Sequence, residues 1–222
     1  MKIETIARFC GLVAATGALA QGDDIPDLIA DGPFALRVKG QGCNSSIDGY
    51  LHTTEVFAYP EPLLILHYDA ASRGGSVADN SSYRFYFNYT GEMHSAAGHE
   101  LGFFVSDITV GEPNGVGLLG KALALQYRPN TNVAMPAFGA AAAVVDLTGF
   151  DGRGKAFLDY YTDDALTVPH TPANVSLDVV YYNWALCWQT SYGVTGRTLS
   201  WVTAGTAHNP TCERVDLLKT EL

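Results

Sequence analysis

Aromatic side chains are the residues of this sequence best suited to bind a ligand. They crowd two segments, Tyr83–Tyr89 and Tyr181–Trp188. Alternate side chains of a strand point to opposite faces, so Tyr86 faces away from its two phenylalanine neighbours. An outward Tyr or Trp can stack on a sugar ring, whereas an inward one fills a sheet core, where aromatics are favoured. Tyr86 and Trp188 are therefore candidate sugar-stacking residues, with core packing as the alternative.

Acidic residues close in sequence are candidates for glycoside hydrolysis, which needs two carboxylates facing one cleft. Asp159, Asp163 and Asp164 form such a group. Because the chain has 23 Asp and Glu residues, neighbours of this kind are expected on a solvated surface. A Gly-x-Ser-x-Gly nucleophile motif is absent from the sequence, so an esterase has no support. We expect no catalytic site, and a glycoside-active enzyme remains the weaker alternative.

Two further motifs come close to known binding patterns and depart from them. His94, His99 and Glu100 could bind zinc or copper if their loop folded back, but their spacing matches no metal motif. The segment Gly115–Ala122 resembles a phosphate-binding loop, yet it has Ala122 where a magnesium-binding Ser or Thr belongs. We therefore predict neither a metal nor a cofactor, and interpret both segments as polar or glycine-rich loops.

Net charge narrows the classes of partner. The 222 residues include only 13 Lys and Arg, and the net charge is −10. Such a chain lacks the basic surface that phosphate backbones and anionic lipids require. We expect neither nucleic acid nor membrane as a partner. The candidate partners, a cell-wall polysaccharide or a wall protein, follow from the resemblance described below and not from the composition.

The first twenty residues predict a signal peptide. Lys2 and Arg8 give a positive start, an apolar stretch follows, and Ala18-Leu19-Ala20 forms a small-x-small exit. The remaining residues, 21–222, would then be one secreted domain. N-glycosylation sequons agree with export, and they lie at Asn44, Asn80, Asn88 and Asn174.

The last four residues suggest a different destination. Lys219-Thr220-Glu221-Leu222 nearly matches a retention signal of the endoplasmic reticulum. Such a signal must be exposed and free, whereas Arg214–Leu218 directly before it has the pattern of a strand. We expect secretion, with retention as the minor alternative.

Cysteine usage predicts one disulfide. An exported chain keeps Cys43, Cys187 and Cys212 after the leader is removed, and an oxidising compartment favours pairing. We predict a Cys187–Cys212 bond. Cys43 could be buried, paired with one of the other two, or used between chains.

Alternation of apolar and polar residues predicts an all-β fold. Residues 21–32 follow the signal peptide, with a predicted helical turn at Ile25–Asp31. Apolar and polar residues then alternate with period two in Phe34–Lys39, which is typical of a half-buried strand. Short β-type runs separated by Gly and Pro continue to the end of the chain, and no long helical periodicity competes. About a dozen such strands predict one antiparallel β-sandwich or jelly-roll domain. The expected strands are Phe34–Lys39, Tyr50–Phe57, Leu63–Tyr68, Tyr83–Tyr89, Leu101–Val105, Lys121–Tyr127, Ala141–Leu147, Ala156–Tyr161, Leu177–Tyr182, Trp184–Gln189, Thr198–Thr203 and Arg214–Leu218.

The C-terminal segment carries a family resemblance. Its pattern is Trp184-Ala185-Leu186-Cys187, then Leu199-Ser200-Trp201-Val202, then Asn209-Pro210-Thr211-Cys212. With the leader and Phe34–Val38, it resembles small secreted fungal proteins, a group that includes cell-wall proteins of spore-bearing cells. The resemblance leaves the middle of the chain unmatched. It implies a β-rich extracellular domain with a C-terminal disulfide and supplies no catalytic residues.

These observations lead to two functional hypotheses. The first is a secreted, N-glycosylated and non-enzymatic interaction protein of a fungal cell wall or the extracellular space. The second is a lectin-like protein that binds carbohydrate through outward aromatic residues.

Overall fold

Strands make up nearly all the regular structure of the described part of the chain. The computed structural model describes residues 28–56, 63–70, 77–106, 122–139, 146–162, 168–171 and 175–222. Within these ranges there are two short 3-10 helices, η2 (Val77–Asp79) and η3 (Ser81–Tyr83). The strands are β1 (Ile29–Gly40), β2 (Asp48–Val56), β3 (Leu63–Ala70), β4 (Phe85–His94), β5 (Glu100–Ser106), β6 (Leu123–Gln126), β7 (Val133–Phe138), β8 (Thr148–Phe150), β9 (Ala156–Thr162), β10 (Val175–Tyr181), β11 (Trp184–Ser191), β12 (Val194–Val202) and β13 (Glu213–Glu221).

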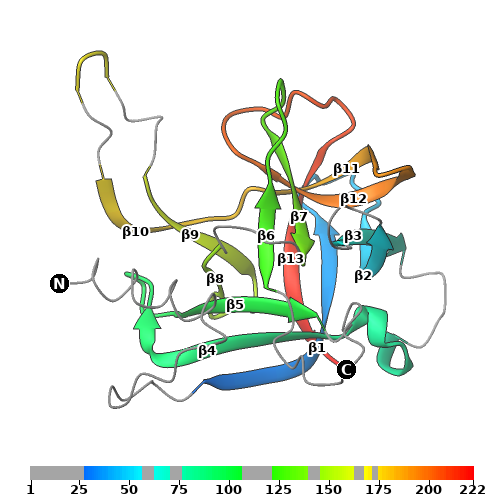
Figure 1. Ribbon diagram of the computed structural model, residues 1–222, viewed down its shortest axis with the longest axis horizontal. Coiled ribbons are helices and arrows are strands. Elements are labelled where there is room, and N and C mark those ends of the chain that lie inside the picture. The colour runs from blue at the N-terminus through cyan, green and yellow to red at the C-terminus, as the bar shows by residue number, and fades with distance from the viewer. Residues whose placement is uncertain are drawn as a thin grey trace, which may run out of the picture.

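Six of these strands close into a ring. Their order is β1–β2–β3–β12–β11–β13, and β13 pairs again with β1, with every pairing antiparallel. The β1–β13 ladder runs from Phe34 opposite Glu221 to Gly40 opposite Val215, so it joins strands from the two ends of the described chain (Figure 1). Closure leaves these six strands without free edges among themselves, which removes sites where another chain could pair.

The inside of the ring is apolar, and every strand contributes to it. In β2, alternate residues from Gly49 to Thr53 are buried while those between them are half-exposed, as expected when one face of a strand lines a core. Trp184 is fully buried and packs edge-to-face against Trp201. The residues of these six strands in the core are Phe34, Leu36, Val38, Leu51, Leu64, Leu66, Trp184, Leu186, Leu199, Trp201, Val215 and Leu217.

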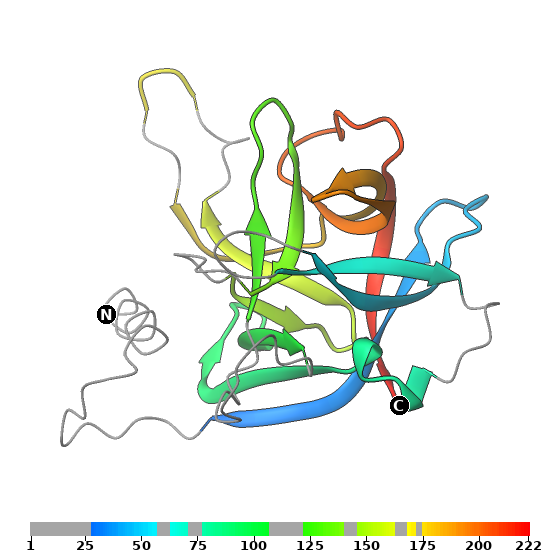
Figure 2. The ribbon, with the colours of Figure 1, turned by 45° about the vertical axis from the view of Figure 1, so that its right-hand side comes forward.

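The remaining strands extend the sheet on both sides of the ring. β4, β5, β8, β9 and β10 continue it from β1, while β7 and β6 continue it from β3 (Figure 1). Two isolated bridges add further connections. Val105 of β5 pairs with Ala122, directly before β6, and Lys155, directly before β9, pairs with Leu218 of β13. In Figure 2 the β6–β7 hairpin and the loop between β12 and β13 lie at the same end of the molecule. That end carries the candidate site described below.

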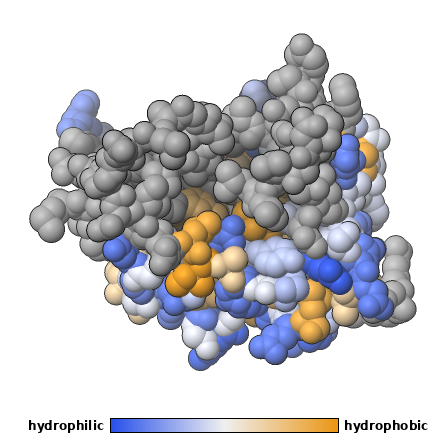
Figure 3. All heavy atoms as spheres, turned by 60° about the horizontal axis from the view of Figure 1, so that its bottom comes forward, coloured by the Kyte–Doolittle hydropathy of each residue, from blue (hydrophilic) through white to orange (hydrophobic). Residues whose placement is uncertain are grey.

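The surface between these elements is mixed. On the face shown in Figure 3, apolar residues of the described chain form small separate patches among polar ones. No helix in the described ranges is long and apolar enough to span a membrane.

The all-β class and the antiparallel pairing predicted from the sequence are confirmed. A two-layer sandwich or jelly roll is not confirmed, because the described strands belong to one continuous hydrogen-bonded sheet that closes on itself. The predicted helical turn at Ile25–Asp31 is wrong from Ile29 onward, where β1 begins. Most of the predicted strand Ala141–Leu147 lies outside the described residues.

Strand β7 is the main element that the sequence patterns missed. All six of its residues are buried, so it shows no polar–apolar alternation. It also contains Pro136, which pairs with Leu125 of β6, and a proline inside a run argues against a strand.

Candidate functional site

Trp188 is the exposed one of the three tryptophans, with 55% of its area accessible to solvent, whereas Trp184 and Trp201 are buried. It follows the buried run Trp184–Cys187, at the point where β11 leaves the core. Arg197 lies opposite it in the β11–β12 ladder, so both side chains start from the same face of the sheet. This exposure excludes core packing, one of the two alternatives stated for Trp188, and sugar stacking stays a prediction.

The loop between β12 and β13 holds the backbone of Trp188. The amide of Trp188 donates to Thr211 Oγ1 at 3.0 Å, and its carbonyl accepts from Asn209 Nδ2 at 3.0 Å. The predicted disulfide is confirmed: Cys187, the residue before Trp188, is bonded to Cys212. The indole is therefore attached to a strand that is fixed from two sides.

A second segment, the β6–β7 hairpin, completes the surroundings. Asn132 Nδ2 donates to the carbonyls of Ala204 and Thr206, at 2.6 and 2.8 Å, and Asn132 Oδ1 accepts from the amide of His208 at 2.8 Å. These bonds tie the hairpin to the β12–β13 loop. Asn130 takes a left-handed conformation with φ of 62° at the hairpin turn, which Asn tolerates better than most residues.

Together these segments enclose a solvent-open depression of about 270 Å³ beside Trp188. Arg128 is its charged residue. The guanidinium donates from Nη2 to Ser191 Oγ at 2.6 Å and from Nη1 to the carbonyl of Thr190 at 3.4 Å. It also lies 6.0 Å from the ring centre of the exposed Tyr192. The lining residues are Arg128, Thr131, Val133, Trp188, Gln189, Thr190 and Asn209.

Tyr86, the other predicted stacking residue, lies elsewhere. It is half-buried on β4, and it packs closely over Gly32, where an added Cβ would come within 3.0 Å of its ring. It does not line the depression at Trp188. The structure therefore does not bring the two candidate aromatics together.

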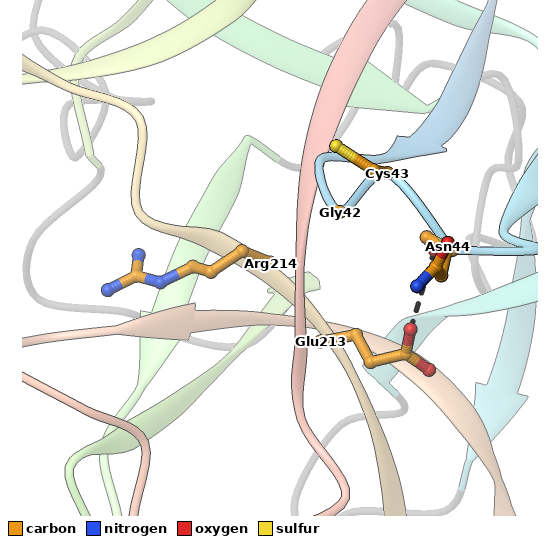
Figure 4. Close-up of a pocket in the computed structure, with 6 residues that line it drawn as sticks. Gly42, Cys43, Asn44, Glu213 and Arg214 are labelled. Atoms are coloured by element: carbon orange, nitrogen blue, oxygen red, sulfur yellow. Dashed lines mark hydrogen bonds between the residues drawn. The ribbon is translucent and has the colours of Figure 1, made fainter.

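Cys43 lies in a second, wider depression of about 510 Å³ (Figure 4). Its thiol is free and exposed, so the alternatives in which it is buried or bonded to Cys187 or Cys212 are excluded. Glu213 accepts hydrogen bonds from Ser45 Oγ at 3.4 Å and from Arg197 Nη2 at 3.0 Å. Arg214 points away from Cys43 in Figure 4 and donates to Asn183 Oδ1. It therefore does not act as a cationic partner for the thiol.

The predicted glycosylation sites differ in accessibility. Asn44 and Asn80 are exposed, and Asn80 Oδ1 accepts from both the amide and the hydroxyl of Ser82 at 2.9 Å. Asn88 is half-buried in the middle of β4, and its Oδ1 atom is buried without a hydrogen bond. Asn174 lies outside the described residues. The exposed positions could carry a glycan without rearrangement of the fold.

The other sequence candidates do not assemble a catalytic or metal centre in the described chain. His94 pairs with Glu100 in the β4–β5 ladder, and His99 lies in the turn between them. Asp159 is half-buried on β9. Within the described ranges no group of three or more His, Cys, Asp or Glu side chains could hold a metal ion. Asp163, Asp164 and most of Gly115–Ala122 lie outside those ranges, as does the predicted signal peptide.

Sequence patterns missed a polar cluster on β2 and β3. His52 and His67 are directly opposite in the ladder, with ring centres 5.9 Å apart. His52 Nδ1 lies 3.2 Å from Asp69 Oδ2, which accepts a hydrogen bond from the hydroxyl of Tyr83 at 2.7 Å. Burial lowers the pKa of both histidines, and His52 lowers that of His67 further. Only the period-two spacing of His67 and Asp69 could have indicated the cluster.

A separate buried carboxyl group contacts β6 and β9. Asp146 accepts from the amide of Leu125 at 2.7 Å and from the hydroxyl of Tyr160. Burial raises the pKa of Asp146 and that of Tyr160. Because Asp146 is 8% exposed and both oxygens are bonded, we interpret it as part of the packing between β6 and β9.

The predicted retention signal is part of the sheet. Lys219, Thr220 and Glu221 belong to β13 and pair with β1, and Lys219 forms an ion pair with Asp31. The first three residues of the motif are therefore held in the sheet, and only Leu222 lies beyond it.

Comparison of the chain with protein-family models, with curated proteins and with solved structures gives no match.

Proposed function

We propose that this chain is an exported, N-glycosylated interaction protein that binds polysaccharide at a cell wall or another extracellular surface, without catalysis. The binding surface in this proposal is the depression at Trp188. The sequence supports export through its leader pattern and sequons, and the Cys187–Cys212 disulfide is typical of oxidising compartments.

The observation that carries the proposal is an exposed indole on a rigid strand next to polar side chains. A large apolar side chain that remains 55% exposed on a well-fixed strand contributes little to the stability of the fold. The same indole can bury its face against the apolar face of a sugar ring. Thr131, Gln189 and Asn209 line the depression beside it, and a few placed polar groups are what fix the orientation of a bound ligand.

The openness of the site favours a polymer over a small free ligand. At about 270 Å³, the depression lies just below the range of roughly 300–1,000 Å³ that buries a drug-sized molecule. A single sugar unit of a longer chain could occupy it while neighbouring units extend across the surface. Binding of this kind needs no catalytic group.

A pull-down assay tests the proposal. The exported protein would be incubated with insoluble chitin, β-glucan, cellulose, pectate and whole fungal wall, and the retained fraction measured. We expect selective retention on at least one polymer, with release by its soluble fragments. Trp188→Ala should lower the apparent affinity at least tenfold, because removing a central Trp anchor costs on the order of 2 kcal/mol.

Tyr127→Ala is the matched control. Tyr127 is 64% exposed but does not line the depression, and its hydroxyl bonds to Tyr160. Its removal should leave retention unchanged. Retention on none of the polymers, or equal retention of Trp188→Ala and the native protein, would overturn the proposal.

A further inference from the structure

The positive charge of Arg128 distinguishes the depression at Trp188 from the rest of this acidic chain. Among the lining residues, Arg128 alone is charged, in a chain whose net charge is −10. Its contacts are the hydroxyl of Ser191, the carbonyl of Thr190 and the ring of Tyr192, all of which are neutral. No carboxylate of the described chain forms an ion pair with it.

The guanidinium also keeps unused donors. Arginine has five N–H groups in a planar fork, and Arg128 uses two of them in its hydrogen bonds to the protein. Its contacts with Ser191 and Tyr192 hold the group in place. A fixed fork of this kind matches the two oxygens of a carboxylate and binds them with paired, charge-assisted hydrogen bonds.

Arg197 provides a comparison within the same protein. It is the residue opposite Trp188 in the β11–β12 ladder, and its guanidinium forms an ion pair with Glu213 at 3.0 Å. Arg128, on the neighbouring hairpin, has no such internal partner in the described chain. Within the described chain, the positive charge without an acidic partner therefore belongs to Arg128 in the depression and not to the neighbouring Arg197.

We infer that the saccharide bound at Trp188 is acidic, with a uronate carboxylate on Arg128 and the sugar ring against the indole. This inference rests on the proposed polysaccharide binding and names its substrate class. The overall negative charge of the chain does not oppose it strongly. At physiological ionic strength charges further apart than about 8 Å are largely screened, so the nearby cation dominates at the site.

Two forms of one polymer test this assignment. Polygalacturonate and its methyl ester have the same sugar backbone, but the ester lacks the carboxylate charge. The native, exported protein should bind the free acid at least tenfold more tightly than the ester at about 0.15 M salt, the ionic strength of the screening argument. Arg128→Gln should bring this ratio close to one, and Arg128→Lys, which keeps the charge but loses the fork, should give an intermediate ratio.

The outcomes separate this inference from the proposed function. A native protein that binds the acid and the ester equally, or an Arg128→Gln variant with the native ratio, would overturn the uronate assignment. In that case loss of binding in Trp188→Ala would still support polysaccharide binding. Equal competition by dextran sulfate would show that any anionic sugar suffices and would overturn the carboxylate assignment. The native acid-to-ester ratio is measured without any variant, so misfolding of a variant cannot produce it.

Discussion

At the residue scale, the histidine pair on β2 and β3 couples the fold to pH. His52 and His67 face each other beside Asp69 of β3, Tyr83 of η3 and Gly196 of β12. A Cβ added at Gly196 would lie 2.8 Å from the His67 ring, so the imidazole occupies the space that glycine leaves. Burial is the main reason that the pKa of each histidine is lowered, and the carboxylate of Asp69 offsets it only in part.

This arrangement predicts that the protein loses stability as the solution becomes acidic. The folded state holds both imidazoles neutral, with pKa values below the ordinary 6.5. Below about pH 6.5 the unfolded chain therefore binds more protons than the folded one, so the free energy of unfolding decreases as the pH is lowered. The stabilisation is complete above pH 6.5. It is lost as the pH falls from there through the lowered pKa values of the two histidines in the folded state. The double variant His52→Gln/His67→Gln should flatten this slope in urea titrations between pH 7.5 and 5.

His208→Gln is the control for this experiment. His208 is exposed in the β12–β13 loop, and its hydrogen bond to Asn132 uses the backbone amide. Its replacement should leave the slope as it is in the native protein. If the double variant kept the native slope, the two half-buried imidazoles could not be its source. Asp146 has a raised pKa and titrates in all three proteins alike, so the comparison cancels its effect.

At the scale of elements, the site depends on three connected segments. β11 supplies Trp188, the β6–β7 hairpin supplies Arg128, and the β12–β13 loop supplies Asn209. The disulfide and the side chain of Asn132 fix the loop to the other two segments. Because no ladder of the sheet contains the loop itself, these cross-links determine how rigidly it lies beside Trp188.

Removing the disulfide should therefore affect both stability and binding. Cys187 and Cys212 are 25 residues apart, and closing a loop of that size stabilises the folded state by about 3 kcal/mol in the chain-entropy model. Cys187→Ala/Cys212→Ala should lower the free energy of unfolding by about that amount in urea titrations. If the proposed polysaccharide binding is correct, the double variant should also weaken retention.

Cys43→Ala serves as the control, because Cys43 is exposed and unbonded. Its free energy of unfolding should stay within about 0.5 kcal/mol of the native value. A double variant as stable as the native protein would contradict the role assigned to the cross-link. A less stable variant with native retention would show that the loop keeps its place at Trp188 without the disulfide.

At the scale of the whole molecule, the closed ring joins parts of the chain that are far apart in sequence. The ladder between β1 and β13 and the narrow contact of β3 with β12, where His67 faces Thr198, complete the circuit. The core inside it is shared by all six strands. A defect at one point of this core should therefore destabilise the ring as a unit.

Leu66→Ala tests this expectation. Leu66 is 1% exposed in the centre of the core, and emptying such a position usually costs about 2–5 kcal/mol. Leu28→Ala is the matched control, because Leu28 is 52% exposed and should change stability by less than about 0.5 kcal/mol. Chemical denaturation followed by tryptophan fluorescence measures both. Equal losses in the two variants would contradict the assignment of Leu66 to the core.

Local patterns in the sequence determined the features that depend on neighbouring residues. Alternation in segments such as Phe34–Lys39 identified strands, because side chains of an extended chain point to opposite faces. The small number of cysteines and the predicted export indicated the Cys187–Cys212 bond, and the aromatic segment Tyr181–Trp188 made Trp188 a candidate for sugar stacking. The same local rule missed β7, since a strand buried on both faces shows no alternation.

Only the tertiary structure decided which residues meet. The pairing of His52 with His67, the approach of Arg128 to the strand of Trp188, and the closure of β1 on β13 all depend on the register between distant strands. Register is set by the whole pattern of burial and by the turns. A shift of one residue would turn the side chains of a strand, such as those of His52 and Trp188, to the other face of the sheet. The sequence therefore indicated strands and an aromatic candidate, whereas the pairing of β7 with β12 brings the charge of Arg128 beside that aromatic.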